Sequence, residues 1–174
     1  MLRAFLEAAG KVKKPYAIGG ALAMAAAGYV RQTSDVDAFV LDRDRHAWIR
    51  ALREAGLDVE PVFMGHHYVA WHPDNPRVRV DLLVPAEQLQ VDVVKRPEVA
   101  SVGGIQFRAF GPATMAAVKF LASEDVPGYL GDFHAMMERG LFDPQLVRQL
   151  VARVEPGELP RYDREVSRRR RTRR

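Results

Sequence analysis

Two aspartates separated by one residue, Asp35 and Asp37, are the side chains in this sequence whose spacing says most about chemistry. They flank the first residue of the predicted strand at residues 36–41, in which Val36, Ala38 and Val40 face one way. Asp35, Asp37 and Phe39 face the other way. Side chains at positions i and i+2 of a strand share a face, about 6–7 Å apart. Carboxylates presented in this way can hold two divalent ions about 3.5–4 Å apart, which clamp the attacking and leaving oxygens of a group transfer.

A glycine pair, Gly19 and Gly20, lies upstream between a brief predicted strand at residues 16–18 and an alanine-rich predicted helix at residues 21–27. Glycines let a phosphate approach the backbone closely, and the N-terminus of a helix presents free N–H groups and partial positive charge. An anion site beside a metal site is the combination that a nucleoside triphosphate requires.

A third carboxylate, Asp81, lies in the apolar run 78–84, on the face opposite to the alternating valine and leucine side chains. An acid in so apolar a strand is costly unless it is paired or bound to a metal. Beside Asp35 and Asp37 it would complete a metal cage and accept the proton of an attacking hydroxyl. Taken alone these signals are weak, because an Asp-x-Asp is common by chance and a lone strand aspartate more often hydrogen-bonds a turn.

The rest of the chain changes from mixed elements to helices. Apolar periodicity predicts helices at residues 2–9, 43–56 and 86–94, strands at 62–64, 68–71, 78–84, 99–102 and 105–110, and helices at 112–123, 128–139 and 144–154. Asp143 followed by Pro144 is a typical start for the last helix. This order predicts an α+β core at residues 1–110 with a helical extension at residues 111–160 packed on it.

Composition excludes several classes of protein. With 174 residues, 48% of them apolar and 28% charged, wholesale disorder, collagen and coiled coil are disfavoured. The absence of cysteine excludes disulfides, thiolate zinc sites and a cysteine nucleophile, and fits the cytoplasm. The longest uncharged stretch, residues 15–30, is shorter than the roughly 20 residues of a membrane-spanning helix. His66, His67 and His72 have no adjacent carboxylate at ligand spacing and are not predicted to bind zinc.

The net charge of +4 is unevenly distributed. Residues 161–174 hold eight arginines and two acids, a net charge of +6, whereas residues 1–160 hold 18 basic and 20 acidic residues, a net charge of −2. Such a basic block repels itself and is predicted to be a disordered tail. It can add salt-sensitive affinity for phosphate backbones, or it can serve only as a solubilising tail.

The order of these features resembles the nucleotidyltransferase fold of the DNA polymerase beta superfamily. The resemblance rests on Gly19-Gly20, a helix, the motif Arg-x-Thr-x-Asp-x-Asp at residues 31–37 and Asp81 in a later apolar strand. It spans about residues 15–150, and within the superfamily the chain is most similar to the AbiEii-like proteins of abortive-infection and toxin–antitoxin systems. The resemblance implies a short mixed sheet flanked by helices, followed by a C-terminal helical extension.

The resemblance also implies residue roles. Gly19 and Gly20 would hold the triphosphate, Arg31 and Thr33 would support the metal loop, Asp35 and Asp37 would bind Mg²⁺ or Mn²⁺, and Asp81 would be the third catalytic carboxylate and metal ligand. The later family motif Lys-x-x-Ala matches Lys119–Ala122, with Asp132 as the acid on the next helix, and both would contact the nucleotide. Without the resemblance, Lys119 in its apolar run would be expected to extend its ammonium group to the surface. Between this lysine and the final aspartate, family members usually place a basic residue and another aspartate, where this chain has Glu124-Asp125-Val126-Pro127-Gly128-Tyr129.

The implied function is an Mg²⁺-dependent transfer of a nucleoside monophosphate from an NTP to a hydroxyl. In toxin-type relatives the acceptor is RNA, such as a tRNA 3′ end, which the arginine tail would help to hold, and a cognate antitoxin would be a partner. Alternative acceptors are a small molecule such as an aminoglycoside or lincosamide, or a protein hydroxyl. A degenerate member that binds a nucleotide or a partner without transfer is the non-enzymatic alternative.

Overall fold

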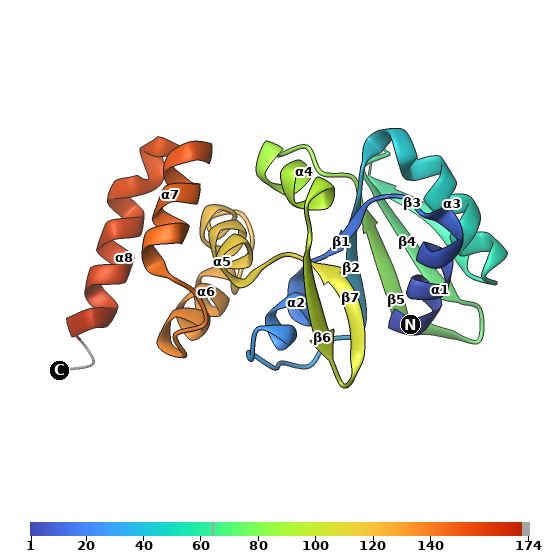
Figure 1. Cartoon of the computed structure of the whole chain (residues 1–174), viewed down its shortest axis with the longest axis horizontal. Helices are drawn as coiled ribbons and strands as arrows, with labels where there is room; N and C mark the ends of the chain where they lie inside the picture. The colour runs from blue at the N-terminus through green and yellow to red at the C-terminus, as the bar shows by residue number, and fades with distance from the viewer. Residues whose placement is uncertain (64, 172–174) are drawn as a thin grey trace. The chain divides into compact units, whose positions relative to one another are not determined.

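The computed structural model describes residues 1–63 and 65–171, without the side chains of residues 169–171 (Figure 1). The chain divides into two compact units. The first comprises Met1–Ala26 and Val30–Phe110, and the second comprises Ala27–Tyr29 and Gly111–Arg174. None of the helices within the described residues is long and apolar enough to cross a membrane.

A mixed seven-stranded sheet forms the first unit, with the strands in the order β3-β4-β5-β2-β1-β7-β6. The pairs β1–β7 and β2–β5 are parallel, and the other neighbours are antiparallel. The strands are β1 (Tyr16–Ile18), β2 (Asp35–Val40), β3 (Asp58–Phe63), β4 (His67–His72), β5 (Asn75–Leu83), β6 (Glu98–Val102) and β7 (Ile105–Ala109). The expected mixed sheet with flanking helices is therefore confirmed.

Four α-helices accompany the sheet: α1 (Leu2–Val12), α2 (Gly20–Ala26), α3 (Arg45–Glu54) and α4 (Gln88–Lys95). Helices α1 and α3 lie side by side, and a short 3-10 turn, Asp42–Asp44, leads into α3 (Figure 1). Phe5 of α1 stacks on Trp48 of α3 at 5.3 Å, and the ring of Tyr16 in β1 meets both rings edge-on. This aromatic cluster joins the two helices to the sheet.

The aromatic cluster also fixes which face of β2 is apolar. Tyr16 lies directly opposite Val40 in the β1–β2 ladder, and directly paired residues point to the same face. The buried side chains of β2, Val36 and Val40 among them, therefore face α1 and α3. Because side chains alternate along a strand, Asp35 and Asp37 lie on the opposite face, as their sequence pattern predicts.

The second unit is a helical bundle of α5 (Pro112–Leu121), α6 (Tyr129–Glu138), α7 (Pro144–Val154) and α8 (Leu159–Arg171). Phe133 of α6 lies at its centre, in ring contact with Phe120, Phe142 and Tyr162. The predicted start of α7 is confirmed, because the Asp143 carboxylate accepts a hydrogen bond from the Gln145 backbone N–H at 2.8 Å. The helical part expected after residue 110 is therefore present.

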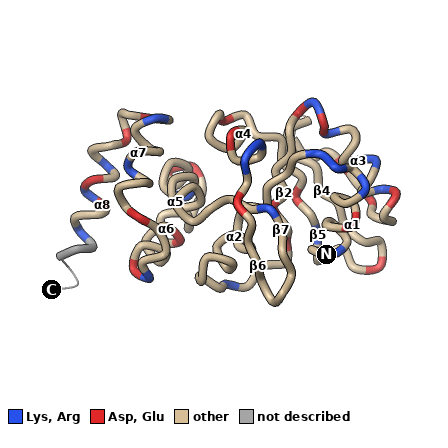
Figure 2. Tube along the Cα trace, in the orientation of Figure 1, with Lys and Arg blue, Asp and Glu red and all other residues tan. Residues whose placement is uncertain are grey.

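The expectation of a disordered tail from residue 161 is wrong as far as Arg171, because these residues belong to α8. Tyr162 is 1% exposed, and its hydroxyl donates to the Pro144 carbonyl at 2.8 Å. The hydrogen bond from Arg148 holds the pKa of Asp163 below its usual value, and His134 pairs with Glu165 at 2.9 Å. These contacts anchor the helix despite its arginines, and Figure 2 shows both signs of charge along it. Thr172–Arg174 lie outside the described residues.

Replacing Tyr162 tests whether α8 is an integral part of the bundle. Tyr162→Phe should lower the free energy of unfolding of the helical unit by about 1–3 kcal/mol, because the Pro144 carbonyl loses its buried donor. Tyr162→Ala should cost about 3–5 kcal/mol. Urea unfolding measures both effects, with Ser167→Ala on the exposed side of α8 as the control. Equal stability of all three variants and the wild type would contradict the placement of α8.

Candidate active site

The parallel pairing of β2 and β5 brings the predicted carboxylates together. Asp37 lies directly opposite Asp81, and Asp35 lies opposite Arg79. Neighbouring strands run about 4.8 Å apart, so the side chains of each pair are adjacent on one face of the sheet. The three aspartates singled out from the sequence therefore lie on one face of two adjacent strands.

Asp37 is also packed against the glycine pair. Gly20, at the start of α2, has a φ of +55°, and a Cβ built there would lie 1.7 Å from Asp37 Oδ2. The backbone N–H of Gly19 donates to the Asp37 carbonyl at 2.8 Å. Glycine is required at position 20 for two reasons, the left-handed backbone and the absence of a side chain where the carboxylate lies.

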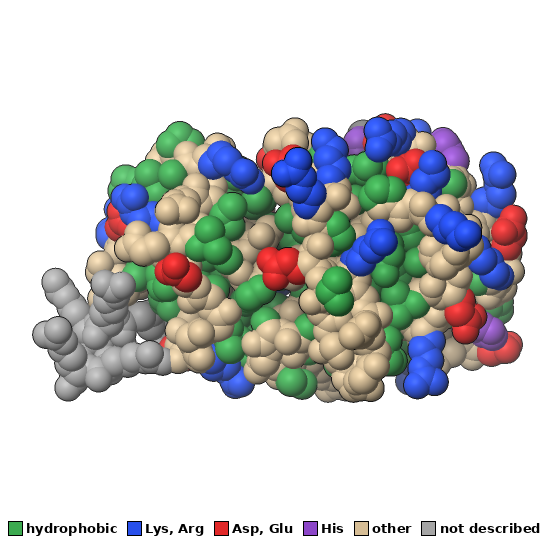
Figure 3. Space-filling model, in the orientation of Figure 1, with side chains coloured by type: hydrophobic (Ala, Val, Ile, Leu, Met, Phe, Trp, Pro, Cys, Tyr) green, Lys and Arg blue, Asp and Glu red, His purple; other side chains and the backbone are tan. Residues whose placement is uncertain are grey.

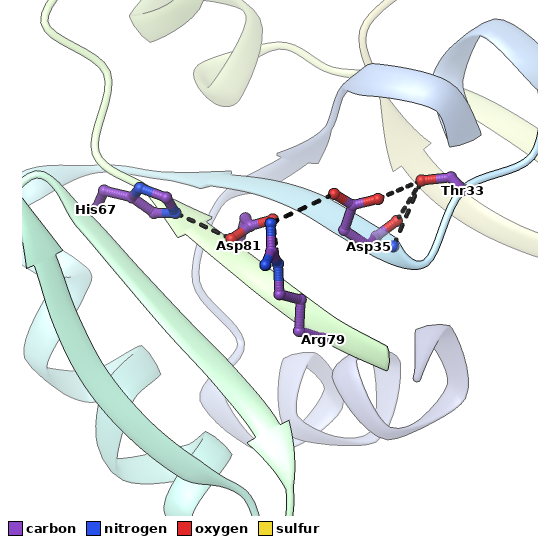
Figure 4. Close-up of polar contacts among 5 residues, drawn as sticks. All are labelled: Thr33, Asp35, His67, Arg79 and Asp81. Carbon is purple, nitrogen blue, oxygen red and sulfur yellow. Dashed lines mark hydrogen bonds and ion pairs between the residues drawn. The ribbon is translucent and has the colours of Figure 1, made fainter. Parts of the chain in front are cut away.

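Asp81 is held from two sides. Only 5% of this residue is exposed, and its Oδ1 lies 3.0 Å from His67 Nε2 while its Oδ2 lies 3.2 Å from Arg79 Nε (Figure 4). A second guanidinium nitrogen of Arg79 lies 3.8 Å from Asp35 Oδ2. Arg79 thus bridges the carboxylates of β2 and β5, and it supplies the positive charge that a buried acid needs.

The loop before β2 holds the other two residues of the motif. The Thr33 hydroxyl hydrogen-bonds the Asp35 carboxylate, so Thr33 lies at the carboxylate cluster (Figure 4). Arg31 is exposed in the connection between α2 and β2. Their expected roles at a metal loop or a phosphate remain predictions.

Lys119 and Asp132 come together in the helical unit. Lys119 is 2% exposed, its Nζ lies 3.1 Å from Asp132 Oδ2, and the ring centroid of Tyr129 lies 3.4 Å from the same nitrogen. The alternative in which Lys119 extends to the surface is therefore wrong. Desolvated charges persist when they are paired in this way, and the nucleotide contact expected of both residues remains a prediction.

The three aspartates are the carboxylates that would have to bind a metal ion. In residues 1–63 and 65–171, no three His, Asp or Glu side chains stand close enough together to hold a metal ion. The donor types nevertheless fit, since Asp35, Asp37 and Asp81 offer oxygen ligands of the kind that Mg²⁺ takes. The guanidinium of Arg79 lies between Asp35 and Asp81 and contacts both carboxylates. The metal-binding role of the three aspartates remains a prediction.

Sequence reasoning missed His67 and Arg79 as members of the site. Arg79 stands two residues before Asp81, the spacing that puts both on one face of a strand, so the pattern contained this signal. His67 reaches Asp81 from β4, and the predicted strand at residues 68–71 did not include it. The tight turn between His72 and Asn75 joins β4 to β5 and sets their register, but the predicted strands at residues 68–71 and 78–84 stopped short of that turn.

Gly20→Ala tests the packing of Asp37 on the glycine pair. The left-handed backbone and the overlap with the carboxylate should together cost about 1–3 kcal/mol of unfolding free energy. Gly10→Ala is the matched control, because Gly10 lies in α1 with nothing within 4 Å of a built Cβ, and it should stabilise by about 1 kcal/mol. Chemical unfolding of both variants gives the comparison, and a Gly20→Ala protein as stable as the wild type would contradict the geometry.

Comparisons with known proteins show the fold. No protein-family model and no curated protein sequence matches the chain. The solution structure of the antibiotic-resistance factor ANT(2″)-Ia aligns with a TM-score of 0.65 at 16% identity, over 94% of this chain and 95% of the other. The crystal structure of ANT(2″)-Ia in complex with adenylyl-2″-tobramycin aligns with a TM-score of 0.58 at 15% identity, over 97% and 95%.

A third similar structure is the lincosamide antibiotic adenylyltransferase LnuA bound to lincomycin. It aligns with a TM-score of 0.51 at 13% identity, over 76% of this chain and 92% of the other. At such identities the likeness concerns the fold alone, and it does not show the AbiEii-like family. The chain has the nucleotidyltransferase fold, with its mixed sheet followed by a C-terminal helical part.

Proposed function

We propose that this chain is a nucleotidyltransferase that moves a nucleoside monophosphate from an NTP to a hydroxyl group. The observation that carries the proposal is the register of β2 and β5, which sets Asp37 beside Asp81 and Asp35 beside Arg79. Next to Asp37, the turn at Gly19 and Gly20 brings bare backbone to the same place. Carboxylates beside a glycine turn are an arrangement that suits binding of a metal–triphosphate complex.

Each residue then has a role in the transfer. Asp35, Asp37 and Asp81 would hold Mg²⁺ or Mn²⁺, which when bound offsets the negative charge of the phosphates. Asp81 accepts the proton of the attacking hydroxyl. The hydroxyl oxygen forms a bond to the α-phosphorus, the bond from this phosphorus to the bridging oxygen breaks, and pyrophosphate leaves with the bonding electrons.

The acceptor has two main candidates. A small hydroxyl compound is favoured by the likeness to adenylyltransferases bound to antibiotic molecules. Aminoglycosides and lincosamides are therefore the first acceptors to test. A protein hydroxyl is a further possible acceptor and can be tested in the same assay. An AbiEii-like identity of this chain is not needed for this proposal.

RNA is the second candidate, because basic side chains gather on the first unit as well as in α8. A hollow of about 460 Å³ is lined by the exposed Lys13, Lys14 and Arg108 together with Tyr16. Figure 2 marks basic residues in the connection from α1 to β1, and Figure 3 shows basic side chains along the edge over α3 and α4. Such a surface suits binding of an RNA phosphate backbone. A cognate antitoxin is expected as a partner only if RNA is the acceptor.

Nucleotide binding should depend on a divalent ion. With NTP at 100 times its Kd, Mg²⁺ should stabilise the protein by about 2.7 kcal/mol, and chelator should remove this gain. Asp37→Asn should abolish the gain, whereas Asp74→Asn, in the exposed turn between β4 and β5, should keep it. Thermal unfolding provides the measurement, and the same shift with and without Mg²⁺, or no shift in either, would refute the metal–nucleotide site.

Transfer should depend on Asp81 more than binding does. With NTP labelled at the α-phosphate, Asp81→Asn should lower label transfer by about 10²–10⁴-fold, because the general base is lost. The NTP affinity of this variant should stay within a few-fold of the wild type. Near-normal transfer by Asp81→Asn would show that another group takes the proton.

The same assay separates the acceptors. Antibiotics, total RNA and the protein itself are offered in parallel, and the labelled product identifies the class. If wild-type protein binds NTP and labels none of them, the non-catalytic alternative gains over the proposed enzyme.

A further inference from the structure

We infer that His67 is a positioning residue that orients the Asp81 carboxylate for proton transfer, an inference that rests on the proposed function. His67 lies on β4, one strand beyond Asp81 on β5. Its Nε2 stands 3.0 Å from Asp81 Oδ1, within hydrogen-bonding distance (Figure 4). None of the roles assigned to the three aspartates accounts for this contact.

The register of β4 and β5 explains how His67 reaches Asp81. Val69 lies directly opposite Asp81, and His67 lies opposite Leu83, two residues further along β5. His67 and Asp81 are therefore diagonal neighbours on the same face of the sheet, a separation that a long side chain spans. An extended strand fixes the imidazole there with only two side-chain torsions left to set.

The direction of the hydrogen bond follows from the partner. An ionised carboxylate can only accept, so Nε2 of His67 must carry the hydrogen and donate it to Oδ1. Both the neutral Nε2–H tautomer and the imidazolium meet this condition. The contact therefore does not depend on the charge of His67.

Two donors on the two oxygens hold Asp81 more firmly than one. Arg79 binds Oδ2 but is 47% exposed at its side chain and also contacts Asp35. With Arg79 alone, the carboxylate could turn about its bond to Cβ. His67, whose side chain is 30% exposed, binds the other oxygen and fixes the plane of the carboxylate.

The order of the strands lets His67 act without blocking the cation. Asp37 lies on β2, on one side of Asp81, and His67 lies on β4, on the other. The contact with His67 can thus persist when Arg79 gives way to a metal ion. Partners that orient a functional side chain in this manner typically contribute 10–100-fold to activity, as an order of magnitude for metal sites.

The experiment compares three variants of the full chain in the assay with NTP labelled at the α-phosphate. The second readout is the release of pyrophosphate when water replaces the hydroxyl acceptor. His67→Ala removes the donor, and His67→Gln keeps an N–H donor at similar reach. His72→Ala, at the end of the same strand and paired with the exposed Asp74, is the matched control. Kd for the Mn²⁺–NTP complex and the melting temperature are measured for each protein.

We expect kcat of His67→Ala to fall about 10–100-fold with Kd for Mn²⁺–NTP within twofold of the wild type. His67→Gln should recover most of this loss, and His72→Ala should match the wild type. In an Asp81→Asn background, His67→Ala should have no further effect on kcat.

Three results would overturn the inference while leaving the proposed function in place. They are an unchanged kcat in His67→Ala, an equal loss in His67→Ala and His67→Gln that follows their melting temperatures, and a loss confined to NTP affinity. A wild-type protein that neither transfers label nor releases pyrophosphate would overturn both proposals together.

Discussion

The parallel register of β2 and β5 places carboxylates side by side on one face of the sheet. Like charges directly opposite each other on neighbouring strands destabilise a sheet, so the pairing of Asp37 with Asp81 needs nearby positive charge. Arg79 supplies this charge from within β5, and His67 adds a donor from β4. The cluster is therefore balanced by the Arg79 guanidinium, and the proposed function places a divalent ion in its stead.

The other elements of the first unit hold β2 and β5 so that their polar side chains share one face of the sheet. Phe5, Tyr16 and Trp48 tie α1 and α3 to the apolar face of the sheet, which leaves the opposite face for the polar side chains. At the end of β1 the chain turns at Gly19 and Gly20, and the missing side chain of Gly20 makes room for the Asp37 carboxylate. The structure thus requires glycine at this turn whether or not a phosphate binds there.

Local patterns predicted the features that depend on neighbouring residues. The alternation along β2 gave the correct face for Asp35 and Asp37, and Asp143 marked the start of α7. Features that depend on contacts between elements were missed. His67 joins the site through the β4–β5 hairpin, whose strands extend beyond the predicted ones to the turn after His72. The tail was judged from its arginines, although Tyr162 anchors α8 in the bundle. The strand predicted at residues 62–64 overlaps only the end of β3, whose acids and Pro61 interrupt the apolar run, and residue 64 lies outside the described residues.

The central claim is that Asp35, Asp37 and Asp81 together form a divalent-cation site. A crystal structure with Mn²⁺ and a non-hydrolysable NTP, read from the anomalous scattering of manganese, tests it most directly. The account predicts an anomalous peak coordinated by carboxylate oxygens of β2 and β5, with Arg79 moved away from Asp35 and Asp81. Nucleotide bound elsewhere, or Arg79 still bridging the two carboxylates with no manganese beside Asp37, would contradict it.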